Sequence, residues 1–178
     1  MISHEDSKWL DAAEQGWQQL RLPLTVGHET FVSGDPSGRR LSVRYFRDAR
    51  GAALIAKAVF GPGTQGPPGH AHGGSIAALL DEAMGAAAWM HGHRVVAADL
   101  GVRFRNMLPL GSRCVVRAEV ISVEGRKVNV KSALSDGADY LFAEGEALFV
   151  TLDPSRFGQL AAAASQVFGE TDASSRAD

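Results

Sequence analysis

The sequence has one cysteine, Cys114, among 178 residues. A single thiol can form neither an intrachain disulfide nor a cysteine-based zinc site, which is typical of a reducing compartment. The segment MISHEDSKWL has no basic region followed by a long apolar run, and nowhere does the chain reach the roughly 18 consecutive apolar residues of a membrane-spanning helix. We therefore expect a cytoplasmic protein without a membrane span.

The chain also lacks a large excess of charge of either sign. Its net charge is −2 and its sequence pI is about 6.3. A general nucleic-acid binder carries a basic footprint that this chain does not have, so we expect no nucleic-acid partner, and any anionic ligand must meet a local basic cluster. With 45% hydrophobic residues, the chain is long enough to bury one sizeable core.

The N-terminal part predicts a helix. Apolar residues recur there at three- and four-residue intervals, which places them on one stripe of an amphipathic helix that ends before Pro23. The predicted helix spans residues 6–20, and its stripe consists of Trp9, Leu10, Ala13, Trp17 and Leu20.

The remainder of the chain predicts an α+β fold. Alternating or apolar segments bounded by glycine and proline indicate strands, and one Ala/Leu-rich run indicates a helix beginning at about Gly74 or Ser75 and ending near Trp89. Four consecutive strands after that helix predict a long antiparallel meander. The predicted strands span residues 41–46, 52–60, 95–104, 112–123, 126–135 and 140–151.

Three segments follow from this pattern. We assign residues 1–24 to the N-terminal helix and a linker, and residues 25–155 to the main domain. Residues 156–178 form an alanine-rich, partly helical or disordered tail.

The segment GHAHGGSIAALLDEAMG, residues 69–85, carries two adjacent acids inside its apolar run. On a helical wheel the bulky residues form one buried side, and Asp81 and Glu82 lie on the two flanks of the other side, about 100° apart among small neighbours. The small neighbours leave room for a ligand. The predicted buried side consists of Ile76, Leu79, Leu80, Ala83, Ala87 and Met90.

This arrangement suits acyl transfer or hydrolysis. A carboxylate held partly out of water can act as a general base or a nucleophile, and free backbone N–H groups at a helix start can receive an oxyanion. Gly73 and Gly74 would let a substrate carbonyl approach those groups. A structural interpretation stays open at this point: His72 caps loop carbonyls, one acid pairs with an arginine, and the glycines only make a turn.

Three motifs in order carry a resemblance to a known family. His72-Gly73-Gly74 is followed after six residues by Asp81, and the chain continues with LGVRFRNMLPLG and VEGRKVNV. Residues 61–154 thereby resemble the hotdog-fold acyl-CoA thioesterases of the phenylacetate-pathway type, most closely the branch called thioesterase superfamily members four and five. The resemblance implies a five- or six-stranded antiparallel sheet wrapped around a central helix, in a homodimer or homotetramer with the active site between subunits.

The resemblance also implies roles for individual residues. The catalytic carboxylate is the acid nine residues after the motif histidine, which is Asp81 rather than Glu82. The Gly73 N–H is the oxyanion donor, His72 positions the loop and the thioester, and Gly74 lies against the substrate. Whether the carboxylate attacks the thioester or activates a water stays open. No cofactor is expected beyond the coenzyme A of the substrate.

One position departs from the family. Where this branch carries a Thr or Ser that helps to hold the attacking water, the chain has Ala97, and a methyl group cannot hydrogen-bond. Asp99, two residues further on and expected on the same face of the strand, would substitute for it. Without such a substitute, the chain would be a slow enzyme or a non-catalytic acyl-CoA binding module. A hotdog dehydratase or hydratase is a less favoured alternative, because it needs a catalytic histidine in the pocket.

Basic residues are expected to hold the coenzyme A phosphates. Arg103 and Arg105 share one face of a predicted strand, and Arg and Lys are the usual phosphate ligands. His70 is expected beside the pocket, and His91 and His93 are not expected to bind a metal because no third ligand is near. By resemblance, the coenzyme A contacts are Arg103, Arg105, Arg126, Lys127, Val128, Asn129, Val130 and Lys131.

Overall fold

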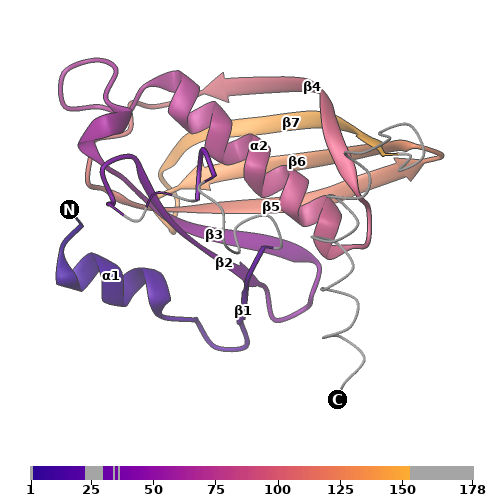
Figure 1. The fold of residues 1–178 in the computed structure, drawn as a ribbon, viewed down its shortest axis with the longest axis horizontal. Coiled ribbons are helices and arrows are strands. Elements are labelled where there is room, and N and C mark those ends of the chain that lie inside the picture. The colour runs from indigo at the N-terminus through magenta and orange to yellow at the C-terminus, as the bar shows by residue number, and fades with distance from the viewer. Residues whose placement is uncertain (1, 23–29, 34, 36, 153–178) are drawn as a thin grey trace.

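The computed structural model describes residues 2–22, 30–33, 35 and 37–152, which form one antiparallel sheet with a long helix across it (Figure 1). The expected end of the N-terminal helix at Pro23, the boundary between residues 24 and 25, and the tail at 156–178 lie outside the described residues.

The sheet has seven strands, all antiparallel, in the order β1-β2-β3-β5-β6-β7-β4. Six of them confirm the strands predicted from alternation, with ends shifted by at most one residue. The seventh, β1, is an addition to the five or six strands expected. The bounds are β1 Gln18–Leu20, β2 Leu41–Arg47, β3 Ala53–Phe60, β4 Val95–Phe104, β5 Arg113–Glu124, β6 Lys127–Ser135 and β7 Leu141–Thr151.

The expectation of a four-strand meander was wrong for β4. Strands β5, β6 and β7 do form a meander, but β5 pairs with β3, and β4 pairs with β7 at the edge of the sheet. The connection from β3 to β4 contains helix α2, Gly73–Met90. This helix crosses the sheet, so that the chain reaches the far edge of the sheet before β4 begins (Figure 1). Alternation within a strand specifies its buried face and says nothing about its neighbours.

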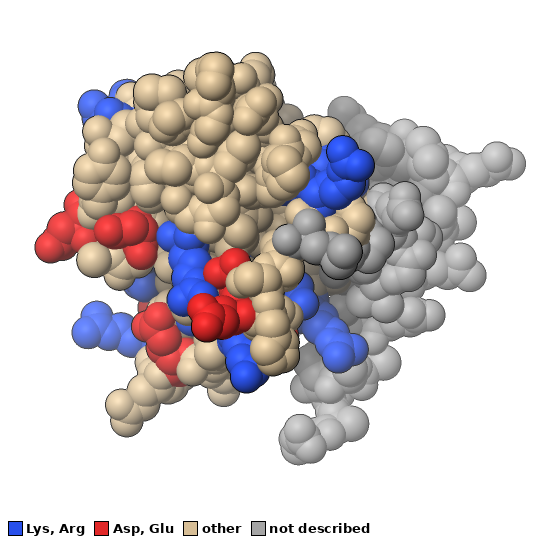
Figure 2. Space-filling view, turned by 90° about the vertical axis from the view of Figure 1, so that its left-hand side faces the viewer, with Lys and Arg blue, Asp and Glu red and all other residues tan. Residues whose placement is uncertain are grey.

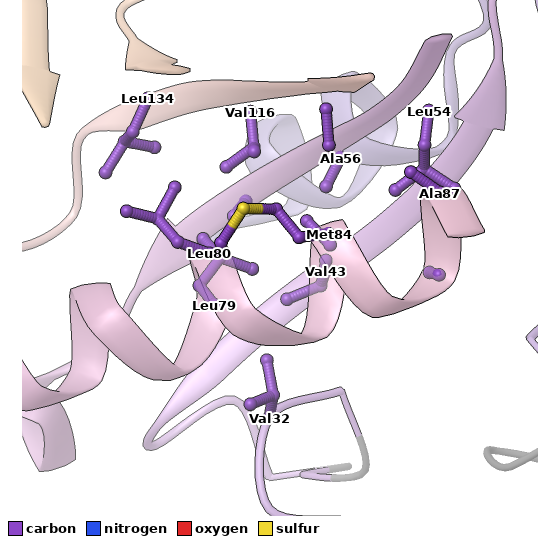
Figure 3. Packing of buried hydrophobic residues seen from close by; sticks show 14 of the residues in the cluster. Val32, Val43, Leu54, Ala56, Leu79, Leu80, Met84, Ala87, Val116 and Leu134 are labelled. Atoms are coloured by element: carbon purple, nitrogen blue, oxygen red, sulfur yellow. The ribbon is translucent and has the colours of Figure 1, made fainter. Parts of the chain in front are cut away.

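Helix α2 buries the side that the helical wheel predicted. Ile76, Leu79, Leu80, Ala83 and Ala87 are all at most 3% exposed, whereas Met90 is half-buried. Figure 3 shows Leu79, Leu80 and Met84 of this helix among buried side chains from the sheet, such as Val116 and Leu134. Packing of this kind, rather than intrinsic helix propensity, is what stabilises most helices in proteins.

The N-terminal helix is shorter than predicted. Helix α1 spans His4–Asp11 with Ser3 as its N-cap, and the chain then leaves the helix to form β1 against β2. Gly16 has φ of +81°, a left-handed conformation that interrupts a helix. The prediction of one helix over residues 6–20 was therefore wrong beyond Asp11, because pairing with the edge of the sheet satisfies the backbone of residues 18–20.

The apolar stripe of this segment still contacts the sheet, on the face opposite α2. Leu10 is fully buried, and the ring of Trp17 lies 5.8 Å from that of Phe46. The buried Lys57 ammonium on β3 donates to the Ala12 carbonyl at 2.8 Å and lies 5.0 Å from the Trp9 ring. The spacing predicted the contact side correctly only in part, since Ala13 is exposed and Leu20 packs against the cluster on the α2 side of the sheet.

Core packing can be tested with two valines of the same strand. Val116 on β5 is fully buried, whereas Val123 on β5 is 45% exposed. We expect Val116→Ala to lower the free energy of unfolding by about 2 kcal/mol, because it removes two buried methyl groups. Val123→Ala makes the same change in strand propensity at an exposed position. It should lower the free energy of unfolding by less than about 0.5 kcal/mol. Urea denaturation of the two variants measures the difference, and equal losses would contradict the assigned core.

Candidate active site

The start of α2 is organised by the motif histidine. His72 is the N-cap, and its Nδ1 accepts the Gly74 N–H at 2.8 Å. Because Nδ1 is the acceptor, the ring proton lies on Nε2. The His72 carbonyl accepts the next two N–H groups, those of Ser75 at 3.0 Å and Ile76 at 3.2 Å. The helix predicted to begin at Gly74 or Ser75 therefore begins at Gly73.

The backbone N–H of Gly73 differs from the other N–H groups of this turn in its hydrogen bonding. It has no acceptor among the described residues, and an N–H at a helix start carries part of the positive end of the helix dipole. The ring of Phe104 lies close to Gly73, since a Cβ on Gly73 would be 3.0 Å from the Phe104 Cζ. A shallow hollow beside Gly73 is also lined by His70, as expected, whose Nδ1 lies 2.9 Å from the Pro68 carbonyl.

Further along α2, eight residues after Gly73, Asp81 lines a cavity of about 350 Å³. Its Oδ1 is buried and has no hydrogen-bond partner within the described part of the chain. The walls are mostly apolar, and they come from α2, β4, β7 and the residues before β2. Besides Asp81 they comprise Leu22, Thr30, Glu82, Gly85, Ala86, Trp89, Val95, Val96, Ala97 and Phe149.

Glu82 lines the same cavity but is already bonded. The Tyr45 hydroxyl on β2 donates to its Oε1, and Ser33 provides a second hydrogen bond. Both acids are half-buried and adjacent in sequence, yet only one of them has an unpaired buried oxygen. The geometry thus separates a structural acid, Glu82, from an available one, Asp81.

Burial shifts the acid–base properties of this cluster. Removal from water raises the pKa of Asp81. Burial also raises the pKa of Glu82, against the opposing hydrogen bonds from Tyr45 and Ser33. The same loss of water, together with the nearby Glu82 charge, raises the pKa of the Tyr45 hydroxyl well above its usual value. A carboxylate with a raised pKa is a stronger base than one in water.

The strand opposite Asp81 places Ala97 in the cavity and Asp99 outside it. The pairing of β4 with β7 shifts between these residues, so that Ala97 pairs with Phe149 and Asp99 with Leu148. Paired residues share a face of the sheet, and Phe149 and Leu148 face opposite sides. The expectation that Asp99 faces the same way as Ala97 was wrong, because a bulge at this point breaks the alternation.

The basic residues expected at coenzyme A do not form one cluster within the chain. Arg103 pairs with Glu144 of β7, whereas Lys127 pairs with Val150 of the same strand. The two β7 partners are six residues apart, or about 20 Å at the rise of a strand. Arg126, next to Lys127, donates to the Thr151 carbonyl at 3.1 Å.

Several of these basic residues already have acidic neighbours. Arg103 lies 3.3 Å from Glu146, and Lys131 lies 3.6 Å from the same carboxylate. Arg105 forms an ion pair with Glu144 at 2.6 Å. Figure 2 shows the face at the left of Figure 1, on which acidic and basic side chains are interspersed rather than gathered by sign.

Two of the expected coenzyme A contacts are core residues. Val128 and Val130 on β6 are at most 1% exposed and belong to the cluster around α2. Asn129, between them, donates to the Ser122 hydroxyl at 2.9 Å. Their side chains point into the core, so the predicted contact of these two positions with the nucleotide stays a prediction that concerns their backbone.

Neither a metal site nor a membrane helix is found. In the described ranges no three His, Cys, Asp or Glu side chains come together as metal ligands, and the Nε2 of His91 lies 3.1 Å from the Ala52 carbonyl. No described helix combines the length and the apolar character needed to cross a bilayer.

Sequence reasoning missed three polar residues of the site. Thr30, Ser33 and Tyr45 lie about 35 to 50 positions before the acids, and the fold brings them to α2. Tyr45 carried the only sequence signal, because it falls on the inward face of a predicted strand, where a hydroxyl needs a partner.

Comparisons with known proteins find similarity to thioesterases. Residues 68–143 match the model of the Thioesterase superfamily. The chain is 39% identical over 95 residues to acyl-coenzyme A thioesterase THEM4 of Xenopus laevis, and 34% identical over 97 residues to THEM5 of Homo sapiens. Each match covers 53% of this chain but only 43% and 39%, respectively, of the relative. The chain thus spans well under two thirds of these relatives.

Solved structures show the same fold. A thioesterase superfamily protein matches with a TM-score of 0.56 and 29% identity, covering 61% of this chain and 53% of the other. A hypothetical thioesterase from Streptococcus pneumoniae, solved with coenzyme A, matches with a TM-score of 0.57 and 12% identity, covering 64% and 86%. The described domain has the hotdog thioesterase fold.

Burial of Asp81 predicts a measurable change in stability with pH. Because its pKa is raised from 3.8 in the folded state, the folded protein holds a proton that the unfolded chain has lost. The free energy of unfolding therefore falls as pH rises from about 3.8 through the raised pKa. We expect Asp81→Asn to be more stable than the parent at neutral pH and equally stable below the unfolded pKa. Urea denaturation across this range measures it, and parallel curves would contradict it.

Proposed function

We propose that this chain, which carries a hotdog domain of the thioesterase superfamily, hydrolyses the thioester bond of an acyl-coenzyme A to a free acid and coenzyme A. The observation that supports this most strongly is the unpaired, buried Oδ1 of Asp81 in an apolar cavity, on the same helix whose first N–H is also unpaired. The names of the relatives and the coenzyme A ligand of the pneumococcal structure point the same way.

The chemistry divides between the start and the middle of α2. Asp81 attacks the thioester carbonyl itself or takes the proton of an attacking water, and its raised pKa suits a base. The Gly73 N–H receives the negative charge that develops on the carbonyl oxygen, where one such donor is worth about 100- to 1,000-fold in rate. His72 holds the turn that presents this N–H.

The acyl group fits the cavity beside Asp81. Its walls include Trp89, Val95 and Phe149, which suit a hydrocarbon or aryl group. The coenzyme A portion would then extend over the surface towards the basic residues of β4 and β6. The phosphate contacts are proposed for Arg103, Arg105 and Lys131, each of which would exchange part of an ion pair with Glu144 or Glu146 for a phosphate.

A second copy of the chain is needed to complete the site. Gly73 and Asp81 are eight residues apart on one helix, a rise of about 12 Å, and they line separate hollows that share no residue. A carbonyl bound to one cannot meet the other in the same chain at the roughly 3 Å required for reaction. In two antiparallel α2 helices, Gly73 of one copy can approach Asp81 of the other.

Two surfaces support this pairing. Gly73, Ala77, Asp81 and Gly85 recur every fourth residue as a half-exposed, mostly small ridge of α2, along which a second helix can come close. The outer edge of β4 pairs with no described strand, and Val96 beside it is 50% exposed. An apolar edge strand of this length is a ready template for pairing with another copy.

The main alternative is an acyl-CoA binding module without turnover. It is favoured by Ala97, which places a methyl group in the cavity opposite Asp81. A hydratase or dehydratase is less favoured, because no histidine is among the described residues that line the Asp81 cavity and His72 is committed to the helix cap.

Replacing the two acids separately tests the assignment. We expect Asp81→Asn to lower kcat about 100- to 10,000-fold, the usual contribution of a general base. Glu82→Gln keeps the same helix position and should retain most of the turnover, because Glu82 is a partner of Tyr45. A thiol reagent detects free coenzyme A, with short, long and aryl acyl-CoA substrates.

The outcomes separate the alternatives. If Glu82→Gln abolishes turnover while Asp81→Asn retains it, the roles of the two acids are reversed. If no substrate is hydrolysed but acyl-CoA raises the melting temperature of the wild-type protein, the binding module is correct.

The oxyanion donor can be removed without breaking the helix. Gly73 is the first helical residue, where proline is tolerated, and the extended conformation of His72 (φ −67°, ψ 139°) suits a residue before proline. We expect Gly73→Pro to lower kcat about 100- to 1,000-fold. Gly73→Ala adds the same contact with Phe104 but retains the N–H, and is the matched control.

Mixing the inactive variants tests the shared site. A pair formed from Asp81→Asn and Gly73→Pro chains has one site with both groups intact and one with neither. Unfolding and refolding the two together should therefore restore turnover that neither has alone. An absence of recovery, with mixed pairs demonstrated by two different affinity tags, would place both groups of each site in one chain.

A further inference from the structure

Among the described residues that line the cavity beside Asp81, one carries a neutral hydroxyl. Thr30 lines the cavity with Asp81 and Ala97, and it is half-buried. The remaining wall residues within the described chain, apart from the two acids and Trp89, have purely apolar side chains or none. A water next to the unpaired Asp81 Oδ1 would need a further partner, because buried water makes about three hydrogen bonds.

We propose that Thr30 positions the attacking water of the hydrolysis against Asp81, from the segment before β2. This inference rests on the proposed function and assigns Thr30 the task for which Ala97 has no polar atom. It also commits Asp81 to the role of general base rather than nucleophile.

The hydrogen bonds around Thr30 orient its oxygen. Thr30 Oγ1 lies 3.2 Å from Ser33 Oγ, and Ser33 in turn hydrogen-bonds Glu82. Either hydroxyl of the Thr30–Ser33 pair can donate; in the proposed arrangement Ser33 donates to Glu82 and its oxygen accepts from Thr30. Thr30 then donates to Ser33, and the lone pairs of its Oγ1 are left to accept from a water.

A Thr30 oxygen that accepts a hydrogen bond suits a nucleophilic water. One of its protons points to Asp81 and the other to Thr30 Oγ1, which leaves an oxygen lone pair for the thioester carbon. As the C–O bond forms, Asp81 takes the first proton and the carbonyl oxygen becomes an oxyanion. When the intermediate collapses, the C–S bond breaks and Asp81 returns the proton to the coenzyme A thiolate, so that water and thioester give acid and thiol.

The segment that carries Thr30 is fixed against α2. Two residues further on, Val32 is 4% exposed and belongs to the central core cluster. Figure 3 shows the Val32 side chain pointing from its loop towards the helix. A hydroxyl held by an anchored segment loses little entropy when it binds a water, which is a requirement for a positioning group.

The test compares variants of Thr30 in steady-state acyl-CoA hydrolysis. Thr30→Val has nearly the same shape without the hydroxyl and should lower kcat about tenfold, the value of one hydrogen bond, with KM unchanged. Thr30→Ser should restore kcat. In the Asp81→Asn background, Thr30→Val should have no further effect, because a water that loses no proton gains nothing from being held. Thr30→Ala serves in place of Thr30→Val if the valine variant does not fold.

Each outcome has one meaning. Thr30→Val with wild-type kcat, a serine variant as slow as the valine variant, or a loss confined to KM would overturn the role of Thr30 and leave the proposed function intact. An equal tenfold loss in the Asp81→Asn background would also overturn it. A wild-type protein that hydrolyses no acyl-CoA would overturn the proposed function itself, and the role of Thr30 with it.

Discussion

Two adjacent carboxylates on a largely buried helix need hydrogen-bond partners, and the site depends on the difference between the hydrogen bonds that the two receive. Glu82 receives the Tyr45 hydroxyl and a bond from Ser33, whereas Asp81 leaves one oxygen unpaired in an apolar cavity. An unpaired buried polar atom costs about 1–3 kcal/mol, so a fold that retains one departs from the rule for stable cores. Such departures concentrate at functional sites, because the same desolvation that destabilises a carboxylate makes it a better base.

Helix α2 determines where everything else can lie. Its bulky side is enclosed by the sheet, so its remaining ridge carries Gly73 and Asp81 at a fixed spacing of about 12 Å. Because α2 also crosses from β3 to the far edge of the sheet, it places β4 there with its outer edge open. The two features that favour a second copy, a slim helix ridge and an open strand edge, therefore follow from one connection.

Local patterns predicted the elements well and their neighbours poorly. The wheel of α2 and the six longer strands followed from apolar spacing. The choice of Asp81 over Glu82 came from the family resemblance, through the nine-residue step from His72, and stays a prediction. The strand order did not follow, because β4 joins β7 through tertiary packing. The N-terminal stripe was correct only in part as a contact side, and it was wrong as one long helix, since Gly16 and the edge of β2 outweigh helical spacing. One bulge reversed the face of Asp99, which no periodicity could have shown.

The hydrogen-bond partners of Glu82 explain why the polar residues around the acids could not be predicted from the sequence. Tyr45 and Ser33 reach α2 only after β2 and the segment before it have packed, so no motif links them to the acids. The consequence is a chain of hydroxyls that runs from Glu82 through Ser33 to Thr30 and ends in the Asp81 cavity. What hydrolysis requires at this point is an acceptor beside the base, and the fold can supply it from any element that borders the cavity. Ala97 on β4 supplies no such acceptor, and the segment before β2, which brings Thr30 to the cavity, is the element that we propose supplies it.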